Sequence, residues 1–326
     1  MPRIALFGAA GAIGTQIAAT LRTRAERYRV VGRSRAALEA SFGDDPLAEI
    51  VTWDPNDPAS VRSAARGVDT IVYLVGVPYT QFELHPALMR ATLDGAIAER
   101  VSRMLLVGTV YPYGRPVTAT VSEDHPRAPH THKGRMRKAQ EDLLLDAGRA
   151  GRIRGTVLRL PDFFGPNVDK SLLHGAFRAA LDGKTALLVG PIDTPHQFVY
   201  TPDVGPVAVA LASEPRAYGQ VWHFAGSGTI AQRDLVRRIF AAAGTQLKTF
   251  VVGKTMLRVA GIFDPLMREL VEMHYLQTTP VILDDTRLRE LLGTVRVTPD
   301  DEAIAETLRT MRVAAPSLTS RPQPAR

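Results

Sequence analysis

The chain contains no cysteine, and only six of its 40 basic residues are lysine. The absence of cysteine excludes disulfide bonds and thiolate chemistry. No apolar run approaches the roughly 20 residues that a membrane-spanning helix requires. No basic-then-apolar segment typical of a signal peptide precedes the first expected strand. We therefore expect a cytoplasmic protein with no membrane partner.

The positive charge of the chain is scattered. The formal net charge is +7 over 326 residues, and the arginines are not gathered into a stripe with aromatic residues between them. A nucleic-acid-binding surface would be clustered, so we expect no nucleic-acid partner. The charge at most attracts an anionic cofactor. The 45% hydrophobic content suits one large α/β unit or two closely packed domains.

The segment 4–14 is the most informative part of the chain. Here a short apolar run is followed by three glycines spaced three residues apart and then by an amphipathic helix. Such a turn lets bare backbone approach a pyrophosphate, and the N–H groups of the helix N-terminus point at the negative charge. Gly14 allows close packing of helix on strand. The residues predicted to bind the diphosphate of a dinucleotide are Gly8, Gly11, Ala12, Ile13 and Gly14.

The end of the second expected strand indicates which dinucleotide binds. NAD-binding folds usually place an acidic residue there to bind the adenosine ribose. This chain instead has Arg33, Ser34 and Arg35 after residues 28–31. Arginine binds phosphate oxygens bidentately, so this composition favours NADP(H) over NAD(H), unless the arginines are ordinary surface charge.

Strand and helix patterns alternate along the chain, which predicts a parallel sheet with helices on both faces. The expected strands are 3–7, 28–31, 50–53, 70–75, 103–107, 155–160, 186–189, 197–200, 220–224 and 249–252. The expected helices are 14–24, 34–40, 58–65, 86–99, 132–145, 171–181, 203–212, 232–243 and 265–275. The residues 314–326, which are rich in Pro, Ser and Arg, are expected to form a flexible tail.

Several segments resemble the short-chain dehydrogenase/reductase superfamily in its extended form, which includes NAD(P)-dependent epimerases and dehydratases. They are the GxxGxxG spacing, Trp53-Asp54-Pro55-Asn56-Asp57-Pro58, and residues 69–76, 158–166 and 198–204. The resemblance implies an α/β, Rossmann-type doubly wound sheet formed by residues 1–165 and about 196–227. It also implies a smaller α/β substrate domain, 166–195 and 228–313, and a homodimer. Further cofactor contacts implied by it are Asp54 with the adenine ring, and Val75, Gly76, Pro161 and Arg137.

The catalytic pattern of that superfamily, Tyr-x-x-x-Lys on one helix, is missing. No tyrosine has a lysine four residues later. Aligned on Glu141, the helix places Lys133 at the tyrosine position and Arg137 at the lysine position. Arg137 would bind the nicotinamide ribose. Lys133 is either a proton donor with a lowered pKa or an anchor for substrate or phosphate.

A substitute acid is therefore sought after the fifth strand. Thr109 falls on the superfamily's catalytic hydroxyl position, and Tyr113 precedes a glycine that lines the pocket in relatives. Tyr113 is the best substitute acid, although Tyr111 and Tyr113 could each be pocket wall. Tyr79 could cover the nicotinamide. Three histidines, at 125, 130 and 132, lie nearby, but their spacing is not typical of a metal site, so no metal is expected.

The leading hypothesis is an NADP(H)-dependent oxidoreductase or epimerase-like enzyme acting on a small carbonyl or hydroxy compound, with Thr109, Tyr113 and Lys133 as catalytic residues. The first alternative is an NADP-sensing protein that has lost catalysis, which the altered pair favours. The second is a nucleotide-sugar epimerase or dehydratase. The region 263–270 carries no motif that we can interpret as ligand chemistry.

Overall fold

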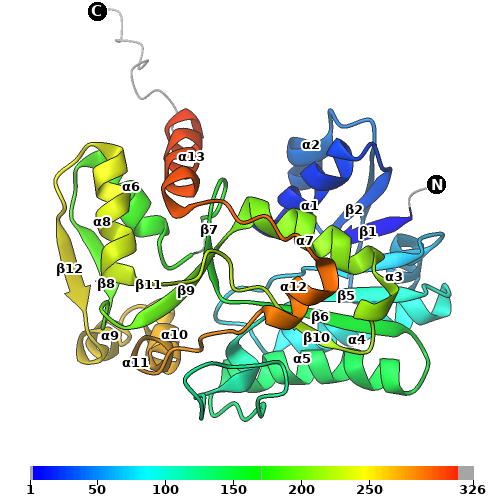
Figure 1. The fold of residues 1–326 in the computed structure, drawn as a ribbon. Coiled ribbons are helices and arrows are strands. Elements are labelled where there is room, and N and C mark those ends of the chain that lie inside the picture. The colour runs from blue at the N-terminus through cyan, green and yellow to red at the C-terminus, as the bar shows by residue number, and fades with distance from the viewer. Residues whose placement is uncertain (1–2, 170, 315–326) are drawn as a thin grey trace, which may run out of the picture.

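The computed structural model describes residues 3–169 and 171–314. Figure 1 shows a main lobe, in which helices cover a large sheet, beside a smaller lobe formed by later parts of the chain. The predicted flexible tail lies outside the described residues except for Ala314, which ends a helix. Among the described residues, no helix combines the length and the apolar character that crossing a bilayer demands.

The main sheet is parallel throughout. Its strands are β1 (Ile4–Phe7), β2 (Tyr28–Gly32), β3 (Ala48–Thr52), β4 (Thr70–Tyr73), β5 (Arg103–Thr109), β6 (Arg154–Leu160) and β10 (Val221–His223). They lie in the order β10-β6-β5-β4-β1-β2-β3. This order confirms the predicted doubly wound sheet. The chain reverses its direction of travel between β1 and β4, and ligands of such sheets bind at the carboxyl ends of the strands beside this point.

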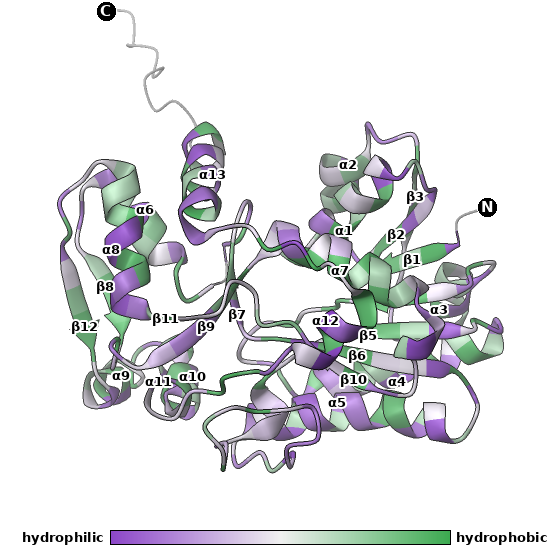
Figure 2. Ribbon diagram, in the orientation of Figure 1, coloured by the Kyte–Doolittle hydropathy of each residue, from purple (hydrophilic) through white to green (hydrophobic). Residues whose placement is uncertain are grey.

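Helices cover both faces of this sheet because alternate strand residues point to opposite sides. Ile4 and Leu6 contact the core beneath α1 (Ala12–Thr23), α2 (Arg35–Phe42), α7 (Thr201–Ser213) and α12 (Thr286–Leu292). Ala5 and Phe7 contact the core beneath α3 (Pro58–Ala65), α4 (Leu84–Ala98) and α5 (His132–Arg149). Figure 2 shows the result, with hydrophobic strands such as β1 and β5 between helices whose outer residues are hydrophilic.

The smaller lobe has its own core. Phe177, Leu188, Ile239 and Ile304 belong to one buried cluster. The elements of this lobe are α6 (His174–Asp182), β8 (Ala186–Val189), α8 (Gln232–Ala243), β12 (Thr249–Val252), α9 (Lys254–Ala260), α10 (Pro265–Met273), α11 (Tyr275–Thr278) and α13 (Asp300–Ala314). A second sheet, of β7 (Asp162–Phe164), β9 (Pro195–Tyr200) and β11 (Thr229–Ala231), has the strand order β11-β9-β7. Two 3-10 segments are Tyr111–Tyr113 and Pro215–Ala217.

Several boundaries differ from the predicted ones. Strand β4 ends at Tyr73, not at residue 75, and β5 continues to Thr109. Helix α13 is not among the predicted elements, although its first turn carries Asp300, Asp301 and Glu302, a composition typical of helix N-termini. Helix α12 lies in the 228–313 segment but packs on the main lobe through the buried Leu288.

Candidate active site

The first glycine turn has the shape that a diphosphate requires. Gly8 has a positive φ of 91°, and a Cβ there would lie 2.8 Å from the backbone of Leu74. A Cβ on Gly14 would lie 2.3 Å from the carbonyl oxygen of Ala9. Helix α1 begins after Gly11, the N-cap residue, so no side chain caps its first N–H groups. These residues, with Ala12 and Ile13 in the first turn, fit a bound dinucleotide.

The predicted adenosine contacts lie at the ends of β2 and β3. Arg33 is exposed immediately after β2. The Ser34 hydroxyl accepts a hydrogen bond from the Ala37 N–H as the N-cap of α2. Arg35 pairs with Glu39 one turn later at 3.2 Å. The Asp54 carboxylate accepts from the Asn56 N–H. Two of the three side chains predicted to bind the 2′-phosphate are thus already engaged within α2.

The remaining predicted cofactor contacts follow β4 and β6. Val75 is buried, and its backbone nitrogen lies 2.9 Å from the position of a Gly8 Cβ. Gly76 comes next and is exposed. Pro161 is buried between β6 and β7. The carboxyl ends of β1, β4 and β6 therefore carry the residues expected beneath the dinucleotide.

Lys133 is held by two carboxylates from a distant helix. It lies in the first turn of α5, where Thr131 is the N-cap, and its side chain is 1% exposed. Its Nζ donates to Glu269, and to Glu272 at 2.8 Å, and its backbone N–H donates to Glu272 at 3.1 Å. Burial alone would raise the pKa of Glu272, but the hydrogen bonds from Lys133 hold it below its usual value. No motif in residues 263–270 indicated this contact.

An aromatic cluster connects Lys133 to Thr109. The Lys133 Nζ lies 4.9 Å from the centre of the Tyr79 ring and 5.6 Å from that of Phe82. The Tyr79 and Tyr111 hydroxyl oxygens are 3.4 Å apart, and the Thr109 hydroxyl accepts from the Tyr111 N–H at 3.3 Å. Thr109, Tyr79 and Tyr111 are partly exposed. The structure therefore brings Thr109 and Lys133 into one cluster.

Arg137 lies one turn after Lys133 on α5 and is buried. Its guanidinium donates to the Val107 carbonyl oxygen at 3.4 Å and lies 3.3 Å from Nδ1 of His85. Burial and the Arg137 charge lower the pKa of His85 to about 2, so this imidazole is neutral at physiological pH. The contacts place Arg137 at the carboxyl end of β5.

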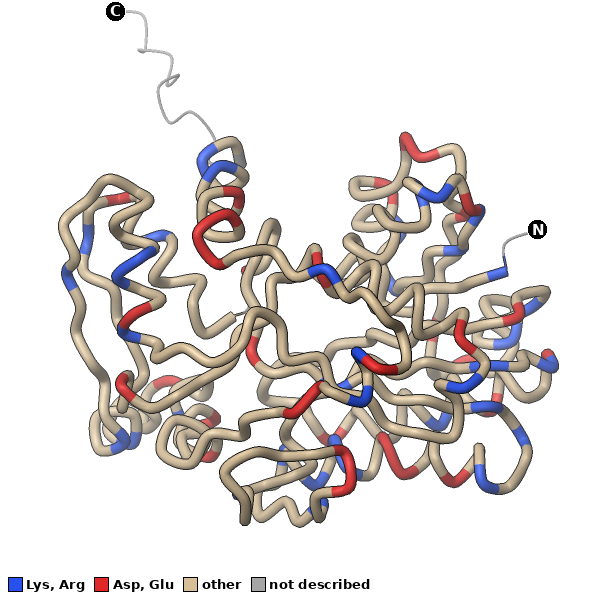
Figure 3. The backbone as a smooth tube through the Cα atoms, in the orientation of Figure 1, with Lys and Arg blue, Asp and Glu red and all other residues tan. Residues whose placement is uncertain are grey.

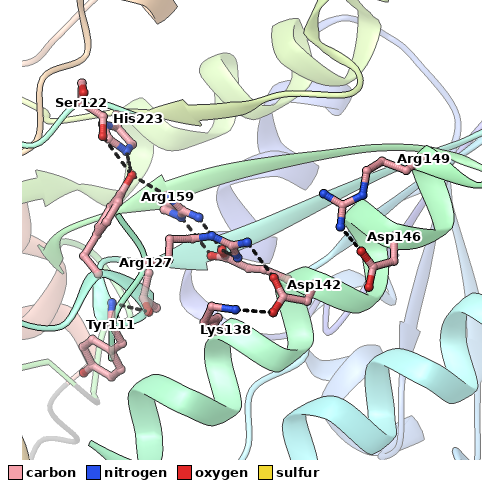
Figure 4. Close-up of polar contacts among 12 residues, drawn as sticks. Tyr111, Ser122, Arg127, Lys138, Asp142, Asp146, Arg149, Arg159 and His223 are labelled. Atoms are coloured by element: carbon pink, nitrogen blue, oxygen red, sulfur yellow. Dashed lines mark hydrogen bonds and ion pairs between the residues drawn. The ribbon is translucent and has the colours of Figure 1, made fainter. Parts of the chain in front are cut away.

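Tyr113 does not have the surroundings of a substitute acid. It is fully buried, and its hydroxyl contacts the Arg159 guanidinium, Nε2 of His223 at 2.5 Å and the Ser122 carbonyl oxygen. Arg159 in turn pairs with Glu141 at 2.5 Å. Figure 4 labels Arg159, His223 and Ser122 of this network. The prediction that Tyr113 donates a proton to substrate is therefore corrected: its hydroxyl belongs to a buried polar network.

A carboxylate–imidazole pair that is absent from the sequence-based predictions joins β7 to β9. Asp162, the first residue of β7, bonds through Oδ2 to Nε2 of His196 on β9 at 2.6 Å. The Asp162 side chain is 31% exposed, whereas that of His196 is 10% exposed. Burial, followed by the Asp162 charge, raises the pKa of Tyr111 to about 12. Asp162 lies in the segment 158–166 that carries the resemblance, but no spacing motif links it to His196.

No metal site was predicted at His125, His130 and His132, and the contacts of the first two differ. His125 is buried and accepts from the Val117 N–H, whereas the His130 ring packs edge-on against Tyr275. In the portion of the chain that the structure describes, no group of three or more His, Asp and Glu side chains is arranged to hold a metal ion.

Comparison with known proteins gives the context for this geometry. A model of the NAD dependent epimerase/dehydratase family matches residues 4–224. The chain is 28% identical over 255 residues to a dTDP-6-deoxy-L-talose 4-dehydrogenase (NAD(P)(+)) of Kitasatospora kifunensis, a match covering 74% of this chain and 79% of that protein. It is 23% identical over 276 residues to a UDP-glucose 4-epimerase of Azospirillum brasilense, covering 76% and 79%.

Solved structures share the fold. A dTDP-glucose 4,6-dehydratase from Bacillus anthracis, determined in complex with NAD, superposes with a TM-score of 0.81 at 15% identity. That match covers 97% of this chain and 98% of the other. A UDP-glucuronic acid 4-epimerase from Bacillus cereus in complex with NAD has a TM-score of 0.78 at 16% identity, covering 95% and 99%.

Proposed function

The chain belongs to the NAD dependent epimerase/dehydratase family, and from this premise we propose that it is an NADP(H)-preferring oxidoreductase of small hydroxy or carbonyl compounds. The observation that carries the proposal is the position of the Thr109–Tyr111–Tyr79–Lys133 cluster. It lies at the same carboxyl edge of the sheet as the glycine turn. Relatives of this chain are named dehydrogenases, epimerases and dehydratases, which supports an NAD(P)-dependent enzyme.

Each residue of the cluster has a separate role in the proposed hydride transfer. A nicotinamide, when bound, would supply the hydride chemistry that interconverts an alcohol and a carbonyl compound. The accompanying proton leaves or enters at the substrate oxygen, and we assign its exchange to the Tyr111 hydroxyl, with the Tyr79 hydroxyl 3.4 Å away. Thr109 helps to hold the substrate oxygen. Arg137 orients the nicotinamide ribose, and Lys133 is the anchor that joins α5 to α10.

The preference for NADP(H) rests mainly on Arg33. This side chain is exposed at the end of β2, where an adenosine 2′-phosphate lies in dinucleotide-binding folds. Ser34 and Arg35 contribute less because their side chains bond within α2. A homodimer stays a prediction that sedimentation equilibrium tests.

Turnover by paired tyrosine variants tests the proposal. Purified protein is assayed for NADPH oxidation with aldehydes, ketones and keto-sugars, and for NADP⁺ reduction with alcohols and sugars. We expect Tyr111→Phe to lower kcat by about 10²–10⁴-fold, the usual contribution of a general acid–base group, with NADPH binding retained. The matched control is Tyr113→Phe, which should lower thermal stability and leave kcat of the folded enzyme within a few-fold.

Other outcomes point to the alternatives. NADPH binding without turnover of any substrate would favour a catalytically inactive sensor. Turnover confined to nucleotide sugars would favour the epimerase or dehydratase alternative. Equal loss of kcat in the two tyrosine variants would contradict the role given to Tyr111.

A further inference from the structure

Exposed apolar side chains are concentrated in one segment of the smaller lobe. Twelve large apolar side chains are exposed in the described part of the chain, and eight of them lie between residues 247 and 266. The most exposed are Ile262, at 73%, and Phe263, at 86%. Single exposed apolar residues are ordinary on protein surfaces, whereas a concentrated group marks a contact surface. This segment therefore has the composition of a contact surface.

The sheet of β8 and β12 also exposes an apolar face. The two strands run parallel, and Leu187 pairs with Phe250, so the two side chains point to the same face. Leu187 is 68% and Phe250 is 48% exposed, whereas Ala186 and Leu188 on the opposite face are buried in the core of the lobe. Parallel sheets are normally covered on both faces. The outer face of this sheet thus has the apolar character of a covered one.

Helix α9 and the residues after it extend this surface. One residue separates β12 from α9, and Figure 1 shows the strand and the helix at the same end of the smaller lobe. In α9, Leu257 is buried, whereas Met256 and Val259 are exposed. The exposed residues Ile262 and Phe263 lie between α9 and α10. We call β8, β12, α9 and residues 261–268 the apolar end of the smaller lobe.

The apolar end carries cations that have no carboxylate partner. Four exposed cations lie in it or directly before β12: Lys248, Lys254, Arg258 and Arg268. Within residues 3–169 and 171–314, no ion pair joins any of them to a carboxylate, whereas Arg233 of the same lobe pairs with Asp193. The one acid in 247–268, Asp264, caps α10 by accepting from the Leu266 N–H. Residues 247–268 therefore carry four positive charges and one negative charge.

The combination of apolar side chains and unpaired cations favours an anionic lipid surface over a second copy of the chain. Two copies in contact through this end would bring two sets of like charges together. Anionic headgroups instead attract Lys and Arg, while apolar side chains enter the boundary between headgroups and acyl chains. Such contact needs no membrane-spanning helix. The expectation of no membrane partner rested on the absence of a spanning segment and does not extend to this kind of contact.

We propose that the apolar end of the smaller lobe binds reversibly to anionic phospholipid bilayers. Ile262 and Phe263 enter the headgroup region, and Lys254 and Arg258 contact the lipid phosphates. The inference is independent of the proposed function, because these four residues lie outside the candidate active site.

Vesicle co-sedimentation of the full chain tests the inference. Vesicles of phosphatidylcholine are compared with vesicles in which half of the lipid is phosphatidylglycerol. We expect binding to the mixed vesicles to be at least about tenfold stronger, because each basic residue near an anionic surface contributes to binding. Binding to the mixed vesicles should weaken as salt is raised from about 0.1 M to about 1 M, which shortens the Debye length from about 10 Å to about 3 Å.

An apolar double variant tests insertion. Ile262→Ser/Phe263→Ser should weaken binding to the mixed vesicles by about 10–100-fold, since apolar surface is no longer buried in lipid. Both side chains are exposed in the folded chain, and thermal unfolding checks that the variant is folded. The matched control is Val117→Ser, which removes a 79% exposed apolar side chain of the main lobe and should leave binding unchanged.

A cation double variant tests the electrostatic part. Lys254→Gln/Arg258→Gln should weaken binding to the mixed vesicles by about 10–30-fold and leave binding to phosphatidylcholine vesicles unchanged. The control Arg24→Gln/Arg152→Gln makes the same change in net charge at exposed positions of the main lobe and should have little effect.

Three results would overturn the inference. The first is wild-type protein that binds neither kind of vesicle. The second is equal binding to both kinds of vesicle, which would contradict the preference for anionic lipid. The third is folded Ile262→Ser/Phe263→Ser that binds as wild type does. Sedimentation equilibrium identifies the rival occupant: self-association that this variant abolishes, without vesicle binding by wild type, would show that a second copy covers the surface.

Discussion

The dinucleotide half of the site and its substrate half are assembled in different ways. The turn Gly8–Gly14 is a short continuous segment, in which a Cβ on Gly14 would meet the Ala9 backbone and a Cβ on Gly8 would meet the Leu74 backbone after β4. The Lys133–Glu269 bond instead joins residues 136 positions apart. Charge is distributed over both lobes, with Lys and Arg interspersed among Asp and Glu (Figure 3). The contacts of Lys133 with two carboxylates therefore come from which side chains the fold brings together, and not from a charged segment of the chain.

The two halves also depend on different kinds of interaction. A diphosphate imposes the same backbone geometry on every relative that binds it. The substrate half depends on single side chains that can be exchanged without disturbing the sheet. Here Lys133, which aligns with the expected tyrosine, bonds to two carboxylates of α10, and Arg159 and Glu141 form a separate buried pair.

The largest expected effect comes from breaking that pair. Arg159→Met would leave Glu141, whose side chain is 2% exposed, as a buried carboxylate without its main partner. We expect a loss of about 3–5 kcal/mol in the free energy of unfolding, measured by urea denaturation. The double variant Arg159→Met/Glu141→Leu should recover part of the loss. A loss below 1 kcal/mol in the single variant would mean that the pair does not support the site.

The next largest effect is expected from Gly14→Ala, which changes only the dinucleotide half of the site. The Cβ of Gly14→Ala would lie 2.3 Å from the Ala9 carbonyl oxygen, so α1 must shift. We expect about 1–3 kcal/mol of destabilisation and a marked loss of NADPH affinity in fluorescence titrations. Gly175→Ala, in α6 with no atom within 4 Å of the added Cβ, is the matched control and should retain full affinity.

We expect acid to lower the free energy of unfolding through His223, which belongs to the buried network of Tyr113 and Arg159. Burial and the Arg159 charge lower the pKa of His223 to about 3, from 6.5. Below pH 6.5 the His223 imidazole is protonated in the unfolded chain but stays neutral in the folded chain. The free energy of unfolding therefore falls as the pH drops from about 6.5 towards 3. The expected slope is about 1.4 kcal/mol per pH unit for this group. His223→Gln should reduce the difference in unfolding free energy between pH 6 and pH 5 by about that amount, and an unchanged difference would show that His223 titrates normally.

The smallest expected effect concerns the choice of cofactor. Arg33→Ala should weaken NADPH binding by about three- to tenfold, as expected for one exposed charge contact, and leave NADH binding unchanged. Parallel titrations with both cofactors measure this. Arg35→Ala is the control, because Arg35 already pairs with Glu39. Equal weakening of both cofactors by Arg33→Ala would contradict a 2′-phosphate contact.

The dinucleotide half of the site could be predicted from the sequence, whereas most contacts of the substrate half could not. The alternating apolar strands and the glycine spacing predict the parallel sheet and the turn because both depend on neighbours within a few residues or on a regular period. Tyr113 was misplaced for a physical reason: its position in the chain is right for a pocket residue, but the direction of its hydroxyl depends on Arg159 and His223, from other strands. Glu269 and His196 carry no local pattern at all.

The sequence by itself determined the doubly wound sheet, the first glycine turn and the absence of a Tyr-x-x-x-Lys pair, since periodicity, glycine placement and residue identity are properties of short segments. Only the tertiary structure decided that Lys133 lies against Glu269 and Glu272, that Tyr113 is buried, and that Asp162 bonds to His196. These contacts depend on how α10, β7 and β9 pack against the main sheet, and that packing is set by apolar burial distributed over the whole chain, which no single segment records.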